Sequence, residues 1–154
     1  MTARRNIARA SLRHALHLTR ILWACGHEAP WLPRVRTRRT DLRLMARATR
    51  RGWVHMVRDA TGPAGFIARD GTTIHALYVH PRAARRGLGR ALLADAKSNA
   101  PRLELWVAEA NTAALAFYRA QGFKEAGRGT GLGNDENLPD IHMVWPHTGA
   151  PGHE

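Results

Sequence analysis

The sequence predicts an α/β (α+β) fold, with one central mixed, mostly antiparallel sheet flanked by helices. First, 154 residues of 44% apolar content are enough for one hydrophobic core but not comfortably for two. Second, apolar residues follow helical spacing before residue 52 and strand-like spacing directly after it. Third, Asp70-Gly71 separates two strand-like segments, as in a β-hairpin. We therefore predict a single domain over residues 6–146, with residues 1–5 and 147–154 as flexible tails.

The N-terminal third predicts one strand and two helices. Residues 6–10 ("NIARA") alternate as an edge strand would. Apolar residues then recur at helical spacing from Ser11, whose hydroxyl can cap the helix, to Cys25, and Gly26 is expected to end it. A second helix is expected from a Thr40 cap to Arg50, followed by Gly52 as its stop.

The remaining segments complete the predicted order β-αα-βββ-α-β-α-ββ. Three strands rich in β-branched and aromatic residues form an antiparallel meander, over residues 53–59, 65–70 and 73–79. Helices are then expected over 89–99 and 111–121, and strands over 102–109, 123–128 and 141–145. Gly122 follows the last helix, where a left-handed cap favours glycine.

The formal charge of +12 lies almost entirely in the N-terminal third. Residues 1–52 hold 13 arginines against two acids, Glu28 and Asp41. Such a segment can bind nucleic acid or an acidic partner, and a basic nucleic-acid-associated protein is therefore one alternative function. The arginines are not interleaved with aromatic residues that could stack on bases, so a solvated basic surface is the simpler interpretation and a nucleic-acid partner is not expected.

Cysteine content and hydropathy narrow the class of protein further. The single cysteine, Cys25, excludes an intramolecular disulfide and a cysteine-rich metal site, which fits a reducing compartment. No apolar run approaches the roughly 18–20 residues that a membrane-spanning helix needs. We therefore expect a cytoplasmic protein that uses no metal and does not associate with a membrane.

The stretch "VHPRAARRGLGRALL", residues 79–93, connects a predicted strand to a predicted helix. The first amides of a helix have no acceptor within it and can bind an anion. Gly87 and Gly89 lack the Cβ atoms that would keep a phosphate away from those amides, and Arg85, Arg86 and Arg90 can surround the anion. By itself, the stretch predicts either a phosphate site or a tight turn with small residues for packing.

The predicted helix over residues 111–121 offers a second candidate binding face. Asn111, Ala114 and Tyr118 are spaced i, i+3 and i+7, which places them on one side of the helix. The Asn111 amide can hydrogen-bond a ligand, the small Ala114 lets the ligand approach, and Tyr118 offers a hydroxyl. The alternative for Tyr118 is an aromatic ring that only packs on the sheet.

Together, these stretches within residues 74–123 resemble the core of the GCN5-related N-acetyltransferases (GNAT). "ARRGLG" is similar to the family's acetyl-CoA motif, and "NTAALAFYRAQGF" to its Asn-x-x-Ala-x-x-x-Tyr helix. The element order extends the resemblance to roughly residues 6–146. It implies the GNAT fold, acetyl-CoA as co-substrate, and transfer of the acetyl group to a primary amine by direct attack. The motif's first position, usually Arg or Gln, is Ala84 here, which removes one side-chain contact and motivates the alternative of a non-catalytic acyl-CoA-binding module.

The resemblance also implies a set of cofactor-binding residues. Backbone groups of three consecutive strand residues would bind the pantetheine arm: Leu77, Tyr78 and Val79. Amides from a run of six residues would hold the pyrophosphate: Arg85, Arg86, Gly87, Leu88, Gly89 and Arg90. Asn111 would contact the pantetheine and Phe117 would pack beside it. Tyr118 would act as the general acid that protonates the departing thiolate.

The sequence leaves the general base open, although the attacking amine must lose a proton. His75 lies on the strand that precedes the glycine-containing turn, and its ordinary pKa suits a base. Glu109 lies at the end of the next strand, and Asp135 or Glu136 could reach in from a late loop. Each of these residues also has a simpler explanation as a surface or loop side chain.

The acceptor amine is equally open and is expected to belong to a small molecule or a peptide. Trp31, Asp135 and Glu136 lie in the two loops where an acceptor would be recognised, and the carboxylates would suit a cationic amine. Trp53 and Trp106 are further candidates for the wall of that site. The resemblance also makes a homodimer an expected assembly.

Overall fold

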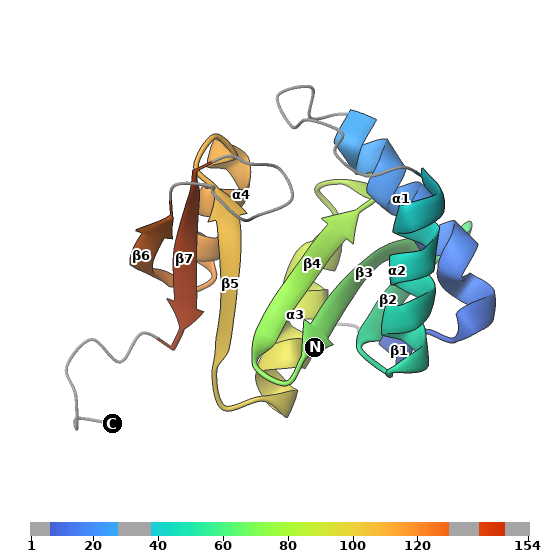
Figure 1. Ribbon diagram of the computed structural model, residues 1–154, viewed down its shortest axis with the longest axis horizontal. Coiled ribbons are helices and arrows are strands. Elements are labelled where there is room, and N and C mark those ends of the chain that lie inside the picture. Colours follow the sequence, from blue (N-terminus) through green and yellow to red (C-terminus); the bar gives the residue numbers. More distant parts are fainter. Residues whose placement is uncertain (1–6, 28–37, 130–138, 147–154) are drawn as a thin grey trace.

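The computed structural model describes residues 7–27, 38–129 and 139–146, which form a seven-stranded sheet with helices on both faces (Figure 1). The first elements are β1 (Ile7–Arg9), a 3-10 turn (Leu12–His14), α1 (Ala15–His27) and α2 (Arg38–Arg50). The meander follows as β2 (Val54–Asp59), β3 (Gly62–Asp70) and β4 (Thr73–Val79). The remainder comprises a 3-10 turn (Pro81–Ala83), α3 (Leu88–Asn99), β5 (Leu103–Ala108), α4 (Thr112–Ala120), β6 (Lys124–Gly129) and β7 (Asp140–Trp145). The predicted element order is confirmed.

The strands lie in the order β1-β2-β3-β4-β5-β7-β6, so β1 is an edge strand as predicted. Every strand pair is antiparallel except β4 and β5, which are parallel. A crossover through α3 is what makes β4 and β5 parallel, since parallel neighbours need a long connection. The prediction of a mixed, mostly antiparallel sheet is therefore confirmed.

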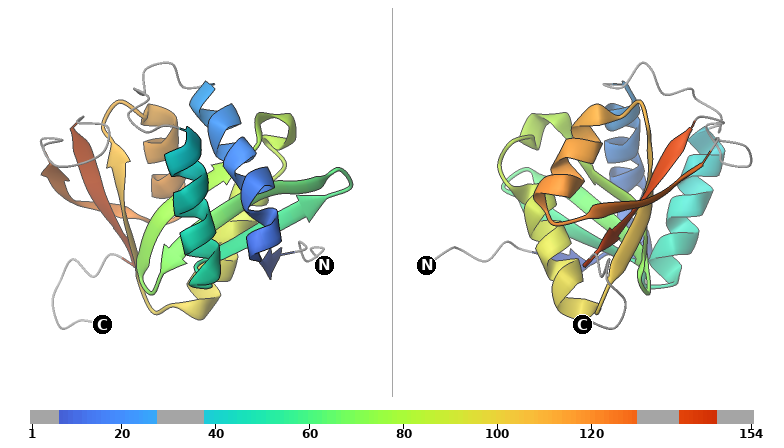
Figure 2. Two further views of the ribbon diagram at one scale, coloured as in Figure 1. Left: turned by 45° about the vertical axis from the view of Figure 1, so that its right-hand side comes forward. Right: turned by 90° about the vertical axis from the view of Figure 1, so that its left-hand side faces the viewer.

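Two hydrophobic layers hold the helices to the sheet, one on each face (Figure 2). On one face, α1 and α2 cover β2, β3 and β4 through buried side chains that include Leu18, Met45 and Phe66. On the other face, α3 and α4 pack through a larger cluster that includes Leu92, Phe123 and Met143. The alternation of each strand supplies side chains to both layers, as period-2 patterning requires.

Three predicted element boundaries are wrong by a few residues. Gly26 lies inside α1, which continues to His27, and Thr40 lies in the first turn of α2, which begins at Arg38. β3 begins at Gly62 and not at residue 65. Gly62 and Pro63 pair with Asp59 and Arg58, beyond a register shift in β2. The sequence therefore indicates where these elements begin or end only to within a few residues.

The junction between β4 and β5 is the feature that positions the candidate site. Only one residue pair, Thr73 with Glu104, is in register between the two strands, and Glu104 N donates to Thr72 O at 2.8 Å just before it. Beyond that pair the strands diverge, as Figure 1 shows. The sheet is thus split by a cleft along most of the length of β4 and β5.

Two negative findings concern the described ranges. None of their helices has both the length and the apolar content needed to cross a membrane. Within the same residues, no group of three or more His, Cys, Asp or Glu side chains is arranged to hold a metal ion.

Candidate active site

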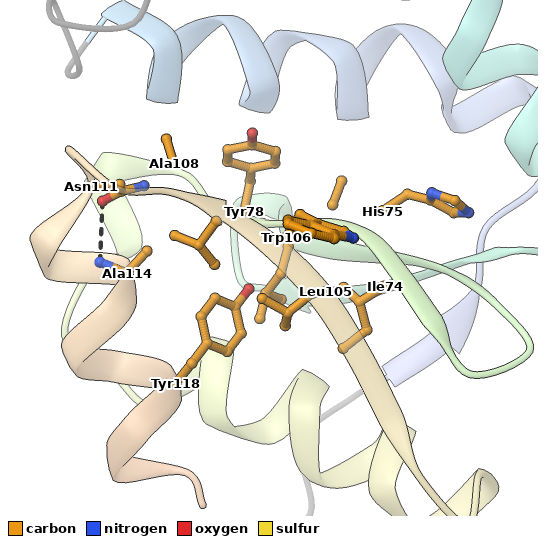
Figure 3. Close-up of a pocket in the computed structure, with 12 residues that line it drawn as sticks. Ile74, His75, Tyr78, Leu105, Trp106, Ala108, Asn111, Ala114 and Tyr118 are labelled. Atoms are coloured by element: carbon orange, nitrogen blue, oxygen red, sulfur yellow. Dashed lines mark hydrogen bonds between the residues drawn. The ribbon is translucent and has the colours of Figure 1, made fainter. Parts of the chain in front are cut away.

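The cleft between β4 and β5 encloses a volume of about 220 Å³ (Figure 3). Its walls come from the two strands and from one face of α4: Ile74, His75, Ala76, Leu77, Tyr78, Leu105, Trp106, Val107, Ala108, Asn111, Ala114 and Tyr118. Several residues that the sequence singled out are therefore brought together here, from three segments that lie far apart in the chain.

The β4 wall presents backbone groups that are not paired with β3 to the cleft. His80 N donates to Ala64 O at 2.8 Å, so the hydrogen-bonded pairs with β3 fall at His80 and, two residues earlier, at Tyr78. Leu77 and Val79 alternate with them and direct their N–H and C=O groups away from β3, toward the side where β5 has diverged. Cys25 Sγ, from α1, donates to Val79 O at 3.2 Å. The strand edge is therefore available for hydrogen bonding to an extended ligand.

The turn between β4 and α3 has the backbone of an anion site. Arg85 (φ 66°) and Gly87 (φ 79°) both adopt left-handed conformations, and Gly87 is the N-cap of α3 without a side chain to cap it. The amides that open α3 consequently face outward with no intrahelical acceptor. The helix dipole adds partial positive charge at the same place. Leu88 contributes only its backbone, because its side chain is buried in the core.

The arginines of this turn do not all face the anion site. Arg82 and Arg86 both contact Asp59 Oδ2, at 2.7 and 3.3 Å, and Arg82 also donates to Pro63 O at 2.9 Å. These contacts attach the turn to the β2–β3 hairpin, and the hydrogen bond from Arg82 holds the pKa of the Asp59 carboxyl below its ordinary value. Arg85 and Arg90 are exposed. The sequence did not indicate that Arg86 is paired with a carboxylate.

The N-terminus of α4 shows that Asn111 has a structural role of its own. Asn111 is the N-cap, and its side-chain oxygen accepts from Ala114 N at 3.1 Å, as the dashed line in Figure 3 shows. The sequence predicted Asn111 and Tyr118 on one face of the helix. In the structure Asn111 caps the start of α4, and Tyr118 projects from the helix two turns later. Among the described residues, the Asn111 Nδ2 group has no hydrogen-bond partner, so it can donate to a ligand in the cleft.

Tyr118 reaches the cleft from α4 while the rest of its ring is held in the core. The residue is 8% exposed, and its ring packs edge-on against Phe117 and Phe123, with centroids 5.2 and 5.4 Å away. Figure 3 shows its hydroxyl pointing away from α4 into the cleft. Burial, with a smaller contribution from Tyr78, raises the pKa of the hydroxyl above its ordinary range. The group therefore stays protonated and can serve as a donor.

The two candidate bases lie in different surroundings. His75 lines the cleft and stacks on Trp53 with ring centroids 5.3 Å apart. It lies at the register shift between β3 and β4, where it is the unpaired residue between Ile74 and Ala76. Glu109 does not line the cleft, and its carboxylate lies 3.3 Å from Arg128 Nη1. Of the two, the geometry favours His75 for contact with a ligand.

Trp106 was a candidate for the wall of the acceptor site, but the sequence did not predict its contacts. Trp106 is 55% exposed and stacks on His142 with centroids 4.8 Å apart, and His142 Nε2 lies 2.9 Å from Glu104 Oε1. The signal was present in the sequence, since Glu104 and Trp106 alternate with the buried residues of β5. Three other predicted acceptor residues, Trp31, Asp135 and Glu136, lie outside the described residues.

The fold is that of a class of acetyltransferases. The model of the acetyltransferase (GNAT) family matches residues 15–123, and the chain belongs to that family, which uses acetyl-CoA. The resemblance stated from the sequence is therefore confirmed, as is the GNAT fold.

Two curated relatives are peptidyl-lysine N-acetyltransferases. YjaB of Salmonella typhimurium strain LT2 is 34% identical over 94 residues, which are 61% of this chain and 64% of YjaB. YiaC of Escherichia coli strain K12 is 36% identical over 83 residues, which are 53% of this chain and 56% of YiaC. The chain thus spans less than two thirds of the length of either relative. The solution structure of apo-form YjaB from Escherichia coli has a TM-score of 0.76 at 25% identity and covers 91% of this chain and 96% of that one.

Proposed function

We propose that the protein transfers the acetyl group of acetyl-CoA to the side-chain amine of a lysine in a peptide or protein. The observation that carries the proposal is the cleft itself, in which the edge of β4 that β5 leaves open meets the hydroxyl of the buried Tyr118. The uncapped start of α3 lies next to Val79 at the end of the same strand. The lysine acceptor is supported by the two relatives, which are named peptidyl-lysine N-acetyltransferases.

The residues present fit two parts of acetyl-CoA, the pyrophosphate and the pantetheine arm. The amides of Leu88, Gly89 and Arg90 would bind the pyrophosphate at the positive end of α3. The backbone groups of Leu77 and Val79 would pair with the amides of the pantetheine arm. Because this site is made of backbone, an alanine at position 84 removes one side-chain contact and leaves the rest intact.

Acetyl-CoA supplies the acetyl group as a thioester, so the reaction forms a C–N bond, breaks a C–S bond and moves one proton from the amine to the sulfur. Tyr118 holds the proton that the sulfur needs, and its raised pKa keeps it in the donor form. The Val79 N–H, directed into the cleft, would stabilise negative charge on the carbonyl oxygen. His75 lies four residues before Val79 on β4, so it would accept the amine proton through water.

The test is turnover with acetyl-CoA and a panel of lysine peptides, read as CoA thiol release and as the mass gain of the peptide. Tyr118→Phe should lower kcat roughly 100-fold and leave the acetyl-CoA affinity nearly unchanged by calorimetry. Arg119→Gln is the matched control, because Arg119 is exposed on the same helix and does not line the cleft.

A different outcome would change the proposal in a defined way. Binding of acetyl-CoA without turnover on any peptide or small amine would make the protein an acyl-CoA-binding module. Turnover that is unaffected in Tyr118→Phe would remove the general-acid role and leave the acetyl transfer standing. Unchanged kcat in His75→Gln would assign the amine proton to another acceptor.

A further inference from the structure

A second hollow lies on the other side of β4, between that strand and α2, and encloses about 510 Å³. We call it the α2 groove and define it by its lining: Leu22, Asp41, Leu44, Met45, Arg47, Ala48, Arg51, Trp53, Phe66, Ala68, His75, Ala76 and Tyr78. The last three also line the β4–β5 cleft, so the groove and the cleft adjoin each other at β4.

We infer that the α2 groove binds the acceptor peptide, and that Arg47 and Arg51 recognise acidic side chains near the target lysine. The inference rests on the proposed function and names the sequence context of the lysine that is acetylated. It assigns a specificity role to residues that do not touch acetyl-CoA.

The two ends of the groove can be told apart by contacts with α1. Asp41, in the first turn of α2, accepts from Trp23 Nε1 at 2.9 Å, and two residues further along α1 Cys25 contacts Val79 O. The Asp41 end therefore lies at the open part of the cleft, where the acetyl group would sit. Figure 2 shows the same arrangement, with the start of α2 and the end of α1 on one side of the molecule.

The opposite end of the groove carries the two arginines. The Arg51 guanidinium lies over the Trp53 ring, 5.1 Å from its centroid, and Trp53 stacks on His75. Arg51 directly follows the last residue of α2, ten residues after Asp41, which is about 15 Å at the rise of a helix. A lysine side chain reaching the cleft would thus place neighbouring residues of its peptide beside Arg47 and Arg51.

The charge of the groove favours an acidic peptide segment. Asp41 is the one acidic residue of α2, and it is buried, whereas Arg47 and Arg51 are exposed. Neither arginine has a carboxylate partner among the residues that the structure describes. A guanidinium held against an aromatic ring keeps its hydrogen-bonding edge free for a carboxylate, which it can bind with two parallel hydrogen bonds.

The lining also argues for a peptide over a nucleic acid. Leu44, Met45 and Ala48 make the α2 wall apolar, which suits the aliphatic parts of a peptide. Base stacking would need an unoccupied aromatic face. Phe66 is buried in the core, Tyr78 packs beside it, and the Trp53 ring already contacts Arg51 and His75.

The experiment uses the full chain and short peptides with one lysine that differ only in bearing Glu, Gln or Arg two to four residues from it. Wild-type kcat/KM should fall in the order Glu, Gln, Arg, by roughly threefold to tenfold at each step at low salt. Arg47→Glu and Arg51→Glu should reverse that order. Arg50→Glu is the matched control, because Arg50 makes the same charge change on the same helix but does not line the groove.

Binding keeps this inference separate from the proposed function. The affinity for a labelled Glu-containing lysine peptide is measured by fluorescence anisotropy with CoA present. It should fall in Arg47→Glu and stay at the wild-type value in Arg50→Glu. That result supports the groove even if no peptide is acetylated. Equal affinity for the Glu and Arg peptides would overturn the inference. So would equal losses in Arg47→Glu and Arg50→Glu, or displacement of the peptide by a single-stranded oligonucleotide, because both indicate a diffuse basic surface.

Discussion

The two sides of the β4–β5 cleft are built from different parts of the chain. The side proposed for acetyl-CoA consists largely of backbone, namely the edge of β4 and the left-handed turn that opens α3. The side proposed for the acceptor consists of side chains, namely Trp106 on β5 and, in the adjoining α2 groove, Arg47 on α2 and Arg51 directly after it. A backbone site tolerates sequence change wherever the conformation is kept, whereas a side-chain site changes its ligand with each substitution. One fold can therefore keep one co-substrate and vary the acceptor.

The largest effect expected on the backbone side comes from Gly89→Ala. A Cβ at Gly89 would lie 3.5 Å from Phe117 Cζ and 3.7 Å from Val79 Cγ2, which are ordinary contact distances, so the fold accommodates it. The methyl group would narrow the path between the turn and the cleft, and we expect acetyl-CoA to bind at least roughly tenfold more weakly by calorimetry. Thermal stability should stay level or rise, since alanine favours a helix by up to about 1 kcal/mol over glycine. A loss of stability together with binding would show that the glycine serves packing instead.

Asn111 separates capping from ligand binding. Asn111→Ala should cost about 1 kcal/mol of unfolding free energy, because the cap to Ala114 N is lost. Asn111→Ser restores a capping oxygen but not the Nδ2 donor, so its stability in chemical denaturation should be close to wild type. Both variants should raise the KM for acetyl-CoA a few-fold. If the serine variant keeps the wild-type KM, Asn111 is a cap alone.

On the side-chain surface, Trp106→Ala should affect the acceptor and little else. The ring is mostly exposed, so the unfolding free energy should change by less than about 1 kcal/mol. We expect the KM for a lysine peptide to rise roughly threefold to tenfold while the KM for acetyl-CoA is unchanged. Leu16→Ala, which truncates an exposed residue of α1, is the control. An effect on the acetyl-CoA KM would instead assign Trp106 to the side of the cleft that binds acetyl-CoA.

The smallest expected effect concerns His55, on β2. Burial lowers the pKa of His55, against an opposing contribution from Asp95, and nearby Arg69 and Arg9 add to the lowering. The unfolded chain then binds more protons than the folded one below about pH 6.5, so this histidine destabilises the fold as the pH falls through that value. His55→Gln should reduce the loss of melting temperature between pH 7.5 and 5.5 by about 1–2 °C.

The parts of the molecule that the sequence could predict are those fixed by local backbone preference. Gly122 does adopt the left-handed conformation that its position after the helix suggested. The strands, helices and their order also followed, because each segment has its own periodicity. These are properties of a few neighbouring residues, and no long-range contact is needed to read them.

The parts that could not be predicted depend on which surfaces meet. Nothing near Arg86 in the chain indicates that Asp59, 27 residues earlier, pairs with its guanidinium. The stack of Trp53 on His75 requires the register shift in β4, which alternation alone does not reveal. The α2 groove arises only when α2 is laid against β4. An acceptor site made of such contacts is therefore invisible until the chain is folded.

The single pair of residues that joins β4 to β5 has one further consequence. Beyond Thr73 and Glu104, a central strand carries the open hydrogen-bonding edge that sheets normally have only at their margins. At a margin, such an edge invites aggregation with another chain. Here α3 and α4 on one face, and α1 on the other, recess it inside the molecule. We expect an extended amide-bearing ligand to complete the ladder there, in place of a strand from another chain.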